Sequence, residues 1–197
     1  MGGLVSRWFI EREGGNKVVD HLVMCGTPNH GSPFGKIDAA RKILKVLTGV
    51  SMNYVPALIP FSSPVLLLLN RSKKLTPTLE QMNPESDFIK TLNKSDDPGI
   101  PYTILAGDVD AYKEPSDQFF AKMLAKAGQS FIFETLFARQ ANDIAVGVES
   151  ILGIEGRRSI APIRRNVACH HLNYFVSESG QKALTAVQWS HPGEGAK

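Results

Sequence analysis

The chain has 197 residues, of which 43% are hydrophobic and 21% are charged, and 22 basic against 19 acidic side chains give a formal net charge of +3. This composition excludes wholesale disorder, and the near balance of charge argues against a nucleic-acid partner. Two cysteines are too few for a disulfide scaffold or a four-cysteine zinc site, and lone thiols favour a reducing compartment such as the cytoplasm. A chain of this size buries roughly 70% of its unfolded surface, enough for one core.

The chain opens with a predicted helix and a predicted strand. Residues 4–13 predict an amphipathic helix that ends at Gly14-Gly15. We expect its buried face to hold the apolar side chains Leu4, Val5, Trp8 and Phe9. The charged side chains Arg7, Glu11 and Arg12 are expected on its other faces. Residues 18–25 predict a strand whose apolar second half indicates cover on both faces. Turn-forming residues follow at 26–33, so the opening has an α/β pattern.

The next segment carries an uncharged run. Residues 37–47 predict a basic amphipathic helix, and residues 46–70 contain no charged side chain. Three prolines and several polar residues interrupt this run, so we expect short helices in place of a transmembrane span. Two interpretations stay open, buried packing and a mobile lid over an apolar substrate site. We assign residues 36–94 to a helical lid-like or cap-like insertion within one domain that covers residues 1–197.

The rest of the chain continues the alternation of helices and strands. The patterns predict a helix at 86–92, a strand at 100–106, a helix-compatible segment at 119–136, a short extended piece at 145–148, a strand within 160–168 and a helix at 179–187. These elements indicate an α/β fold with a few parallel strands and flanking helices. Arg157-Arg158 and Arg164-Arg165 are expected on a solvated face, with contact to an anionic lipid or phosphate as the alternative.

The first three residues look like half of a catalytic turn. Met1-Gly2-Gly3 leads straight into the first predicted helix, as does the far half of a nucleophile elbow, the G-x-S-x-G turn between a strand and a helix. Met1 would follow the serine and Gly2 would be the closing glycine, where close backbones require small residues. A GTPN-GS loop at 26–32 follows the next strand. The pattern resembles the lipase/esterase-like members of the α/β-hydrolase superfamily.

Two later loops are similar to the acid and histidine loops of that superfamily, in the same serine, acid, histidine order. The loop at 142–150 offers Asp143, and the loop at 169–175 offers His171, which matches better than His170 because an aromatic pair follows it at the usual interval. Asp143 could instead cap a helix or turn, and His171 could be a surface or hydrogen-bonded core histidine. Asp108 is the alternative acid, together with Asp110.

The resemblance implies a partial α/β-hydrolase fold and acyl transfer on an ester or lipid-like small molecule. His171 would be the general base, Asp143 its orienting acid and the Met1 backbone N–H an oxyanion donor. The serine itself would stand immediately before Met1 and is absent from this chain. We therefore expect the C-terminal part of a serine hydrolase, inactive alone. The alternative is a non-catalytic binding or interaction module derived from a hydrolase.

The same residues give no reason to expect a cofactor or a metal. Cys169-His170-His171 offers fewer ligands than a zinc site usually has, and Cys25 at the end of an apolar strand is more typical of a buried inert thiol than of a catalyst with His21 or His30. In a C-terminal fragment, the strand at 18–25 would become an apolar sheet edge. We therefore expect self-association through that edge.

Overall fold

The computed structural model describes residues 1–35, 76–109, 111, 140–143, 145–171 and 173–189. The predicted helices at 37–47 and 119–136, the uncharged run at 46–70 and the rival acid Asp110 lie outside the described residues. The two interpretations of the uncharged run therefore stay predictions.

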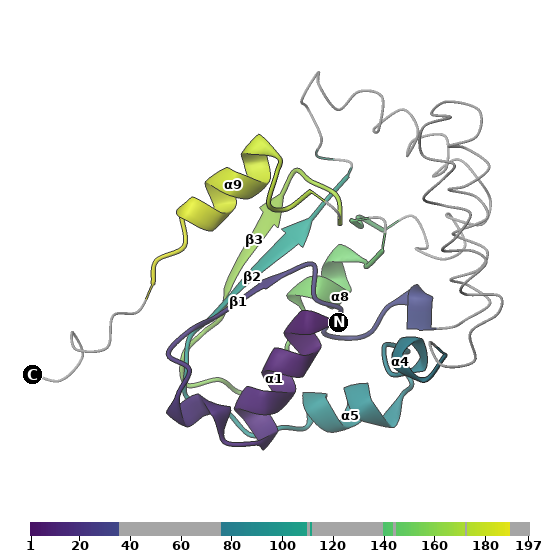
Figure 1. Cartoon of the computed structure of the whole chain (residues 1–197), viewed down its shortest axis with the longest axis vertical. Helices are drawn as coiled ribbons and strands as arrows, with labels where there is room; N and C mark the ends of the chain where they lie inside the picture. The colour runs from purple at the N-terminus through teal and green to yellow at the C-terminus, as the bar shows by residue number, and fades with distance from the viewer. Residues whose placement is uncertain (36–75, 110, 112–139, 144, 172, 190–197) are drawn as a thin grey trace, which may run out of the picture.

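Within the described residues, one sheet of three parallel strands has the order β1 (Leu22–Cys25), β2 (Tyr102–Gly107), β3 (Ile163–Val167). Met24 pairs with Ile104, which pairs with Arg164 on its other side. The α/β fold with parallel strands is thereby confirmed (Figure 1). The first strand is shorter than the predicted 18–25, because the 3-10 turn η1 (Gly15–Lys17) precedes Val18, which is 75% exposed.

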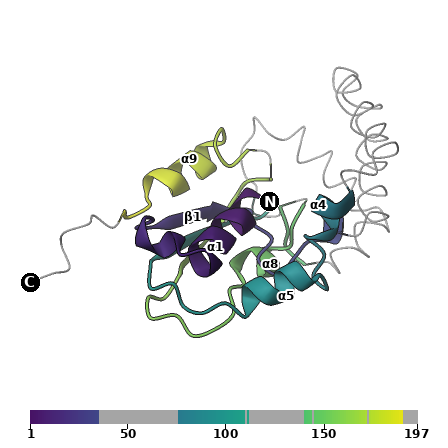
Figure 2. The ribbon, with the colours of Figure 1, turned by 60° about the horizontal axis from the view of Figure 1, so that its bottom comes forward.

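Helices cover both faces of the sheet. Helices α1 (Gly2–Arg12) and α8 (Val148–Leu152) lie on one face, and α9 (Glu178–Thr185) lies on the other (Figure 2). Alternate strand residues divide between the two cores, as the pleat requires. Met24 and Ile104 join the α1/α8 core, whereas Leu105 joins the α9 core with Tyr174.

A second layer forms where α5 (Asp87–Asn93) packs on α1. Leu4 of α1 meets Ile89 and Leu92 of α5 in a buried apolar cluster. Ser86 caps α5 by accepting the N–H of Ile89 at 3.2 Å, which confirms the helix predicted at 86–92. The short elements η2 (Pro33–Gly35) and α4 (Thr76–Glu80) lie beside this layer (Figure 1). Helix α5 falls within the predicted lid-like insertion, and it packs against α1.

The predicted buried face of α1 is wrong in part. The structure buries Leu4, Arg7 and Ile10, and it leaves Val5 57% and Phe9 45% exposed. Arg7 was expected away from the core, yet it is fully buried because Glu11 and Asn29 supply polar partners for its guanidinium. A periodicity argument counts only apolar side chains, so it misses a charged residue that is buried with its partners.

Two further expectations are corrected. The segment predicted to be extended at 145–148 pairs only through a bridge between Asn142 and Gly147, and Val148 begins α8. Val148 and Ile151 lie three residues apart and both pack into the core, a helical spacing. Arg158 was expected on a solvated face, but its side chain is only 7% exposed and lies 3.3 Å from Glu11.

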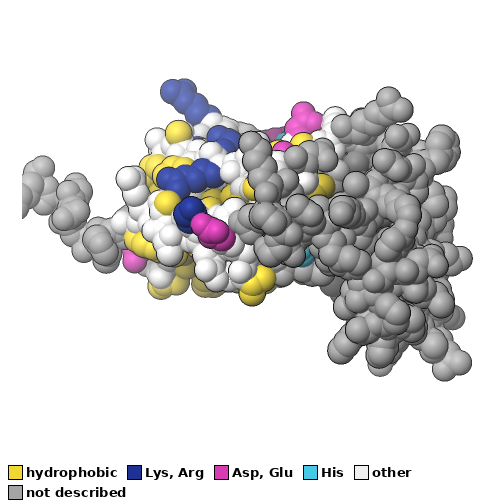
Figure 3. Space-filling model, turned by 90° about the horizontal axis from the view of Figure 1, so that it is seen from above, with side chains coloured by type: hydrophobic (Ala, Val, Ile, Leu, Met, Phe, Trp, Pro, Cys, Tyr) yellow, Lys and Arg dark blue, Asp and Glu magenta, His cyan; other side chains and the backbone are white. Residues whose placement is uncertain are grey.

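The described surface is mixed in character. Figure 3 shows hydrophobic side chains exposed beside Lys and Arg side chains on the described part of one face. No helix among the described residues is long and apolar enough to cross a membrane.

Candidate active site

A short loop holds the Asp143 carboxylate in a fixed position. The bridge between Asn142 and Gly147 closes the loop, and the Asp143 N–H donates to the Val146 carbonyl at 3.0 Å. The carboxylate oxygen Oδ1 accepts the N–H groups of Ala145 at 3.1 Å and Val146 at 2.8 Å. Oδ1 thus caps the turn, as one interpretation of the sequence expected, and it leaves Oδ2 available to another group.

The other carboxylate oxygen faces the predicted histidine. Nδ1 of His171 lies 2.8 Å from Oδ2 of Asp143, and the His171 backbone N–H donates to the Asp143 carbonyl at 2.9 Å. Because an ionised carboxylate only accepts, the proton of this bond belongs to Nδ1. The Asp143 side chain is fully buried and the His171 side chain is 34% exposed. The ring nitrogen Nε2 is thus the one left to exchange a proton with another group.

The neighbouring candidates take other positions. His170 is buried, and its backbone N–H donates to Oδ1 of Asn173 at 2.7 Å, which closes the turn after β3. The rival acid Asp108 follows β2, and its N–H donates to the carbonyl of Val167. Oδ2 of Asp143 contacts the His171 ring. The geometry therefore brings together the two residues that the sequence resemblance selected.

Tyr174 is a third member of this group, and sequence analysis missed its contacts. Its hydroxyl lies 3.0 Å from Oδ2 of Asp143 and accepts the N–H of Gly107 at 2.6 Å. The ring is buried against Leu105 and Val167. Burial raises the pKa of the Tyr174 hydroxyl, and the nearby Asp143 charge raises it further. The aromatic pair after His171 was the available signal, although only its first member is buried, since Phe175 is 70% exposed.

Gly26 allows the end of β1 to approach the pair. Its φ is +59°, and a Cβ atom there would lie 2.7 Å from Oδ2 of Asp143 and 3.0 Å from Nδ1 of His171. A side chain at this position would therefore displace either the carboxylate or the imidazole.

The start of α1 lies against the same loop. A Cβ on Gly3 would overlap the Thr27 side chain, whereas a Cβ on Gly2 would meet nothing within 4 Å. The requirement for a small residue therefore holds at Gly3 and not at Gly2. Thr27, which contacts α1, directly follows Gly26, which lies against the Asp143–His171 pair. Met1 is the N-cap of α1, and burial lowers the pKa of its amine.

Asn29 anchors this loop to three helices. Its side chain is fully buried, accepts from Nη1 of Arg7 at 3.1 Å and donates to the Ile151 carbonyl at 2.6 Å. Its own carbonyl accepts from Nδ2 of Asn93 at 3.1 Å. The loop therefore has fixed contacts with α1, α8 and α5.

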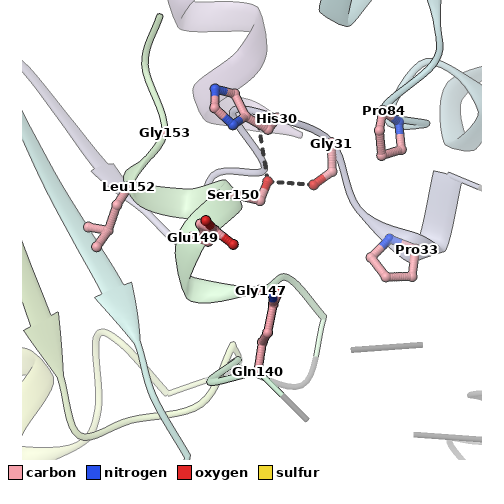
Figure 4. A pocket seen from close by; sticks show the side chains of 10 residues that line it. All are labelled: His30, Gly31, Pro33, Pro84, Gln140, Gly147, Glu149, Ser150, Leu152 and Gly153. Atoms are coloured by element: carbon pink, nitrogen blue, oxygen red, sulfur yellow. Dashed lines mark hydrogen bonds between the residues drawn. The ribbon is translucent and has the colours of Figure 1, made fainter. Parts of the chain in front are cut away.

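A pocket of about 540 Å³ lies beside α8. Figure 4 shows Gly147, Glu149 and Ser150 on one side of it and Pro33 and Pro84 on the other. The Ser150 hydroxyl accepts from the His30 N–H at 3.2 Å and donates to the Gly31 carbonyl at 2.6 Å, so it is occupied by the loop. The remaining lining residues are His30, Gly31, Gln140, Leu152 and Gly153. His171 does not line this pocket.

The described residues contain no group of three or more His, Cys, Asp or Glu side chains that could hold a metal ion. Both cysteines are free thiols. Burial raises the pKa of Cys25 to about 11 and that of Cys169 to about 12, so neither thiol is activated as a nucleophile near neutral pH.

The model of a family described as a domain of unknown function, DUF7379, matches residues 1–189. No curated protein and no solved structure matches the chain.

Proposed function

The chain belongs to the DUF7379 family, and from its own geometry we propose that it is the C-terminal portion of a serine hydrolase of lipase/esterase type, with an α/β-hydrolase-like fold. The observation that carries the proposal is the 2.8 Å contact between Nδ1 of His171 and Oδ2 of Asp143. A fully buried carboxylate orients a partly exposed imidazole at the carboxyl edge of a parallel sheet, where α/β proteins generally bind their ligands.

The roles follow from the positions of the atoms. Nε2 of His171 accepts the proton of an attacking hydroxyl and later returns it to the leaving group. Asp143 fixes the ring tautomer and stabilises the imidazolium that forms. The start of α1 contacts Thr27, one residue from Gly26, so a serine immediately before Met1 would stand near His171. The Met1 N–H would then help to stabilise the oxyanion, a contribution of roughly 3 kcal/mol in comparable enzymes.

The substrate class is an ester with an apolar acyl group. The uncharged run at 46–70 supports this assignment, as do the exposed Phe175 and Val176 a few residues after His171. In the proposal, the lid-like insertion predicted at residues 36–94 covers such a substrate.

The experiment has two steps. A serine-directed fluorophosphonate probe should leave this chain unlabelled, because the nucleophile is not part of it. The coding sequence upstream of the Met1 codon should then read in frame through a Gly-x-Ser triplet. Stop codons there would favour the alternative of a non-catalytic binding module derived from a hydrolase, and labelling of the present chain would contradict the proposal.

The polypeptide that includes the upstream segment should hydrolyse p-nitrophenyl esters of apolar acids. Asp143→Asn should lower kcat by a factor on the order of 10⁴, since the amide no longer holds the productive tautomer. Asp108→Asn is the matched control, because Asp108 was the alternative acid in the sequence analysis. Since Asp143 is the acid assigned to His171, Asp108→Asn should cost much less activity than Asp143→Asn. Equal losses in the two variants would count against the assignment of Asp143.

A further inference from the structure

The Asp143 carboxylate is buried without a Lys or Arg partner in the described contacts, and its negative charge is balanced by hydrogen-bond donors. Two backbone N–H groups donate to Oδ1. His171 Nδ1 and the Tyr174 hydroxyl both contact Oδ2, at 2.8 and 3.0 Å. A carboxylate has about four lone-pair sites, so this set of donors is complete. Oδ2 is therefore shared between the imidazole and a phenol.

The direction of the phenol hydrogen bond is fixed by its other neighbour. The Gly107 N–H can only donate, and it donates to the Tyr174 oxygen at 2.6 Å. The hydroxyl has one proton, which consequently goes to Oδ2 of Asp143. A donor that itself accepts a short hydrogen bond is polarised and becomes a stronger donor. Tyr174 thus withdraws part of the charge on Oδ2 from His171.

We infer that Tyr174 is a positioning residue that competes with His171 for Oδ2 of Asp143 and so weakens the hydrogen bond between the acid and the histidine. The inference rests on the proposed function, because it concerns the same pair. A general base has to release its proton as well as accept it, and efficiency is greatest when its proton affinity is matched to the working pH. Tyr174 would limit how strongly the Asp143 carboxylate polarises the His171 ring.

The test measures the hydrogen bond directly by NMR on the present chain. The signal of the His171 Nδ1–H group is assigned by its disappearance in His171→Gln. Tyr174→Phe removes the competing donor, so the Nδ1–H proton should move downfield as its bond to Oδ2 strengthens. A fluorinated tyrosine at position 174 is a stronger donor of nearly the same shape, so it should move the signal upfield.

Tyr102→Phe is the matched control. Tyr102 is as buried as Tyr174, at 2% exposure, and its hydroxyl also donates to a carboxylate, that of Glu11 at 3.0 Å. Tyr102 begins β2, whereas Gly107, the partner of Tyr174, ends it. Removal of the Tyr102 hydroxyl should therefore leave the His171 signal unmoved. A general loosening of the fold would affect both variants alike.

The outcomes separate the two proposals. An unmoved or upfield-shifted signal in Tyr174→Phe, or no upfield shift with the fluorinated residue, would overturn the role of Tyr174 and leave the Asp143–His171 pair in place. If the unmodified chain has no Nδ1–H tautomer at His171, the pair does not form in solution, and the proposed function fails with it. The fluorinated residue keeps the test decisive should Tyr174→Phe not fold.

Discussion

Nε of Arg7 lies 2.9 Å from Oε1 of Glu11, and both side chains are fully buried inside the first helix layer. The same Oε1 accepts the Tyr102 hydroxyl at 3.0 Å and lies 3.3 Å from Nη2 of Arg158. One buried carboxylate therefore serves two guanidinium groups. Nε and Nη1 of Arg158 are buried and have no hydrogen-bond partner among the described residues. Arg7 depends on Glu11 for compensation of its charge, whereas Arg158 also lies close enough to Asp97 for their charges to attract.

Glu11→Gln should be strongly destabilising. It leaves two buried cations without their shared carboxylate, and breaking a buried pair in this way costs about 3–5 kcal/mol. The free energy of unfolding in urea measures the loss. Glu178→Gln is the control, since Glu178 pairs with Lys182 at the same helical spacing and 3.0 Å but on the surface. That change should cost less than about 1 kcal/mol, and similar losses in the two variants would contradict the explanation.

Gly26→Ala should disturb the candidate site and the fold together. The positive φ alone costs roughly 1 kcal/mol for a residue with a side chain, and overpacking against Asp143 and His171 adds about 1–3 kcal/mol. Gly14→Ala separates the two effects, because Gly14 has φ +75° and nothing within 4 Å of the added atom. In urea, the free energy of unfolding of Gly26→Ala should be well below that of Gly14→Ala. Equal values would mean that the carboxylate and imidazole move aside without cost.

The sequence allowed prediction of the residues whose role depends on local pattern. The patterns at 100–106, 160–168 and 86–92 predicted β2, β3 and α5, and two loop motifs selected Asp143 and His171. In each case the signal lies within a few neighbouring residues, so it can be read without the fold.

The rest could not be predicted, because it depends on residues far apart in the chain. Arg7 is buried through Asn29, 22 residues away, and Tyr174 meets Gly107 across 67 residues. Helix α8 has only five residues and is fixed by packing against β2. Its length is below that at which intrinsic helix propensity decides a structure. Tertiary contacts thus determine the burial of Arg7, the contacts of Tyr174 and the position of α8, and sequence periodicity carries no information on them.

The two thiols should make the stability of the protein depend on pH in the alkaline range. Burial raises the pKa of Cys25 to about 11 and of Cys169 to about 12, from about 9 in the unfolded chain. The folded state therefore holds both protons more tightly. This contribution to stability is complete below pH 9 and is lost as pH rises toward 11 and 12, because the unfolded thiols ionise first.

Unfolding measurements across that pH range test the thiol contribution. The double variant Cys25→Ala, Cys169→Ala should lose less stability between pH 9 and 11 than the unchanged chain. Tyrosines and lysines titrate in both proteins, so the difference between the two slopes isolates the thiols. Identical slopes would show that the thiols are as accessible in the folded state as in the unfolded one.

The free side of β1 should promote self-association. Among the described strands, β1 pairs with β2 alone. Leu22 and Gly26 donate their N–H groups to the carbonyls of Pro101 and Leu105, so the N–H of Val23, between them, faces away from β2. An unpaired edge of this kind can bind a strand of a second copy. Size-exclusion chromatography with light scattering should therefore find dimers or larger species.

Val23→Pro identifies the surface involved. Proline removes the outward N–H without removing a hydrogen bond to β2, and edge strands tolerate it. The variant should shift the population toward monomer and keep the far-ultraviolet circular dichroism spectrum of the parent. Val5→Thr on exposed α1 is the control, because Val5 is 57% exposed and lies outside the sheet. A stable monomer in the unchanged chain would mean that the β1 edge is not available for pairing.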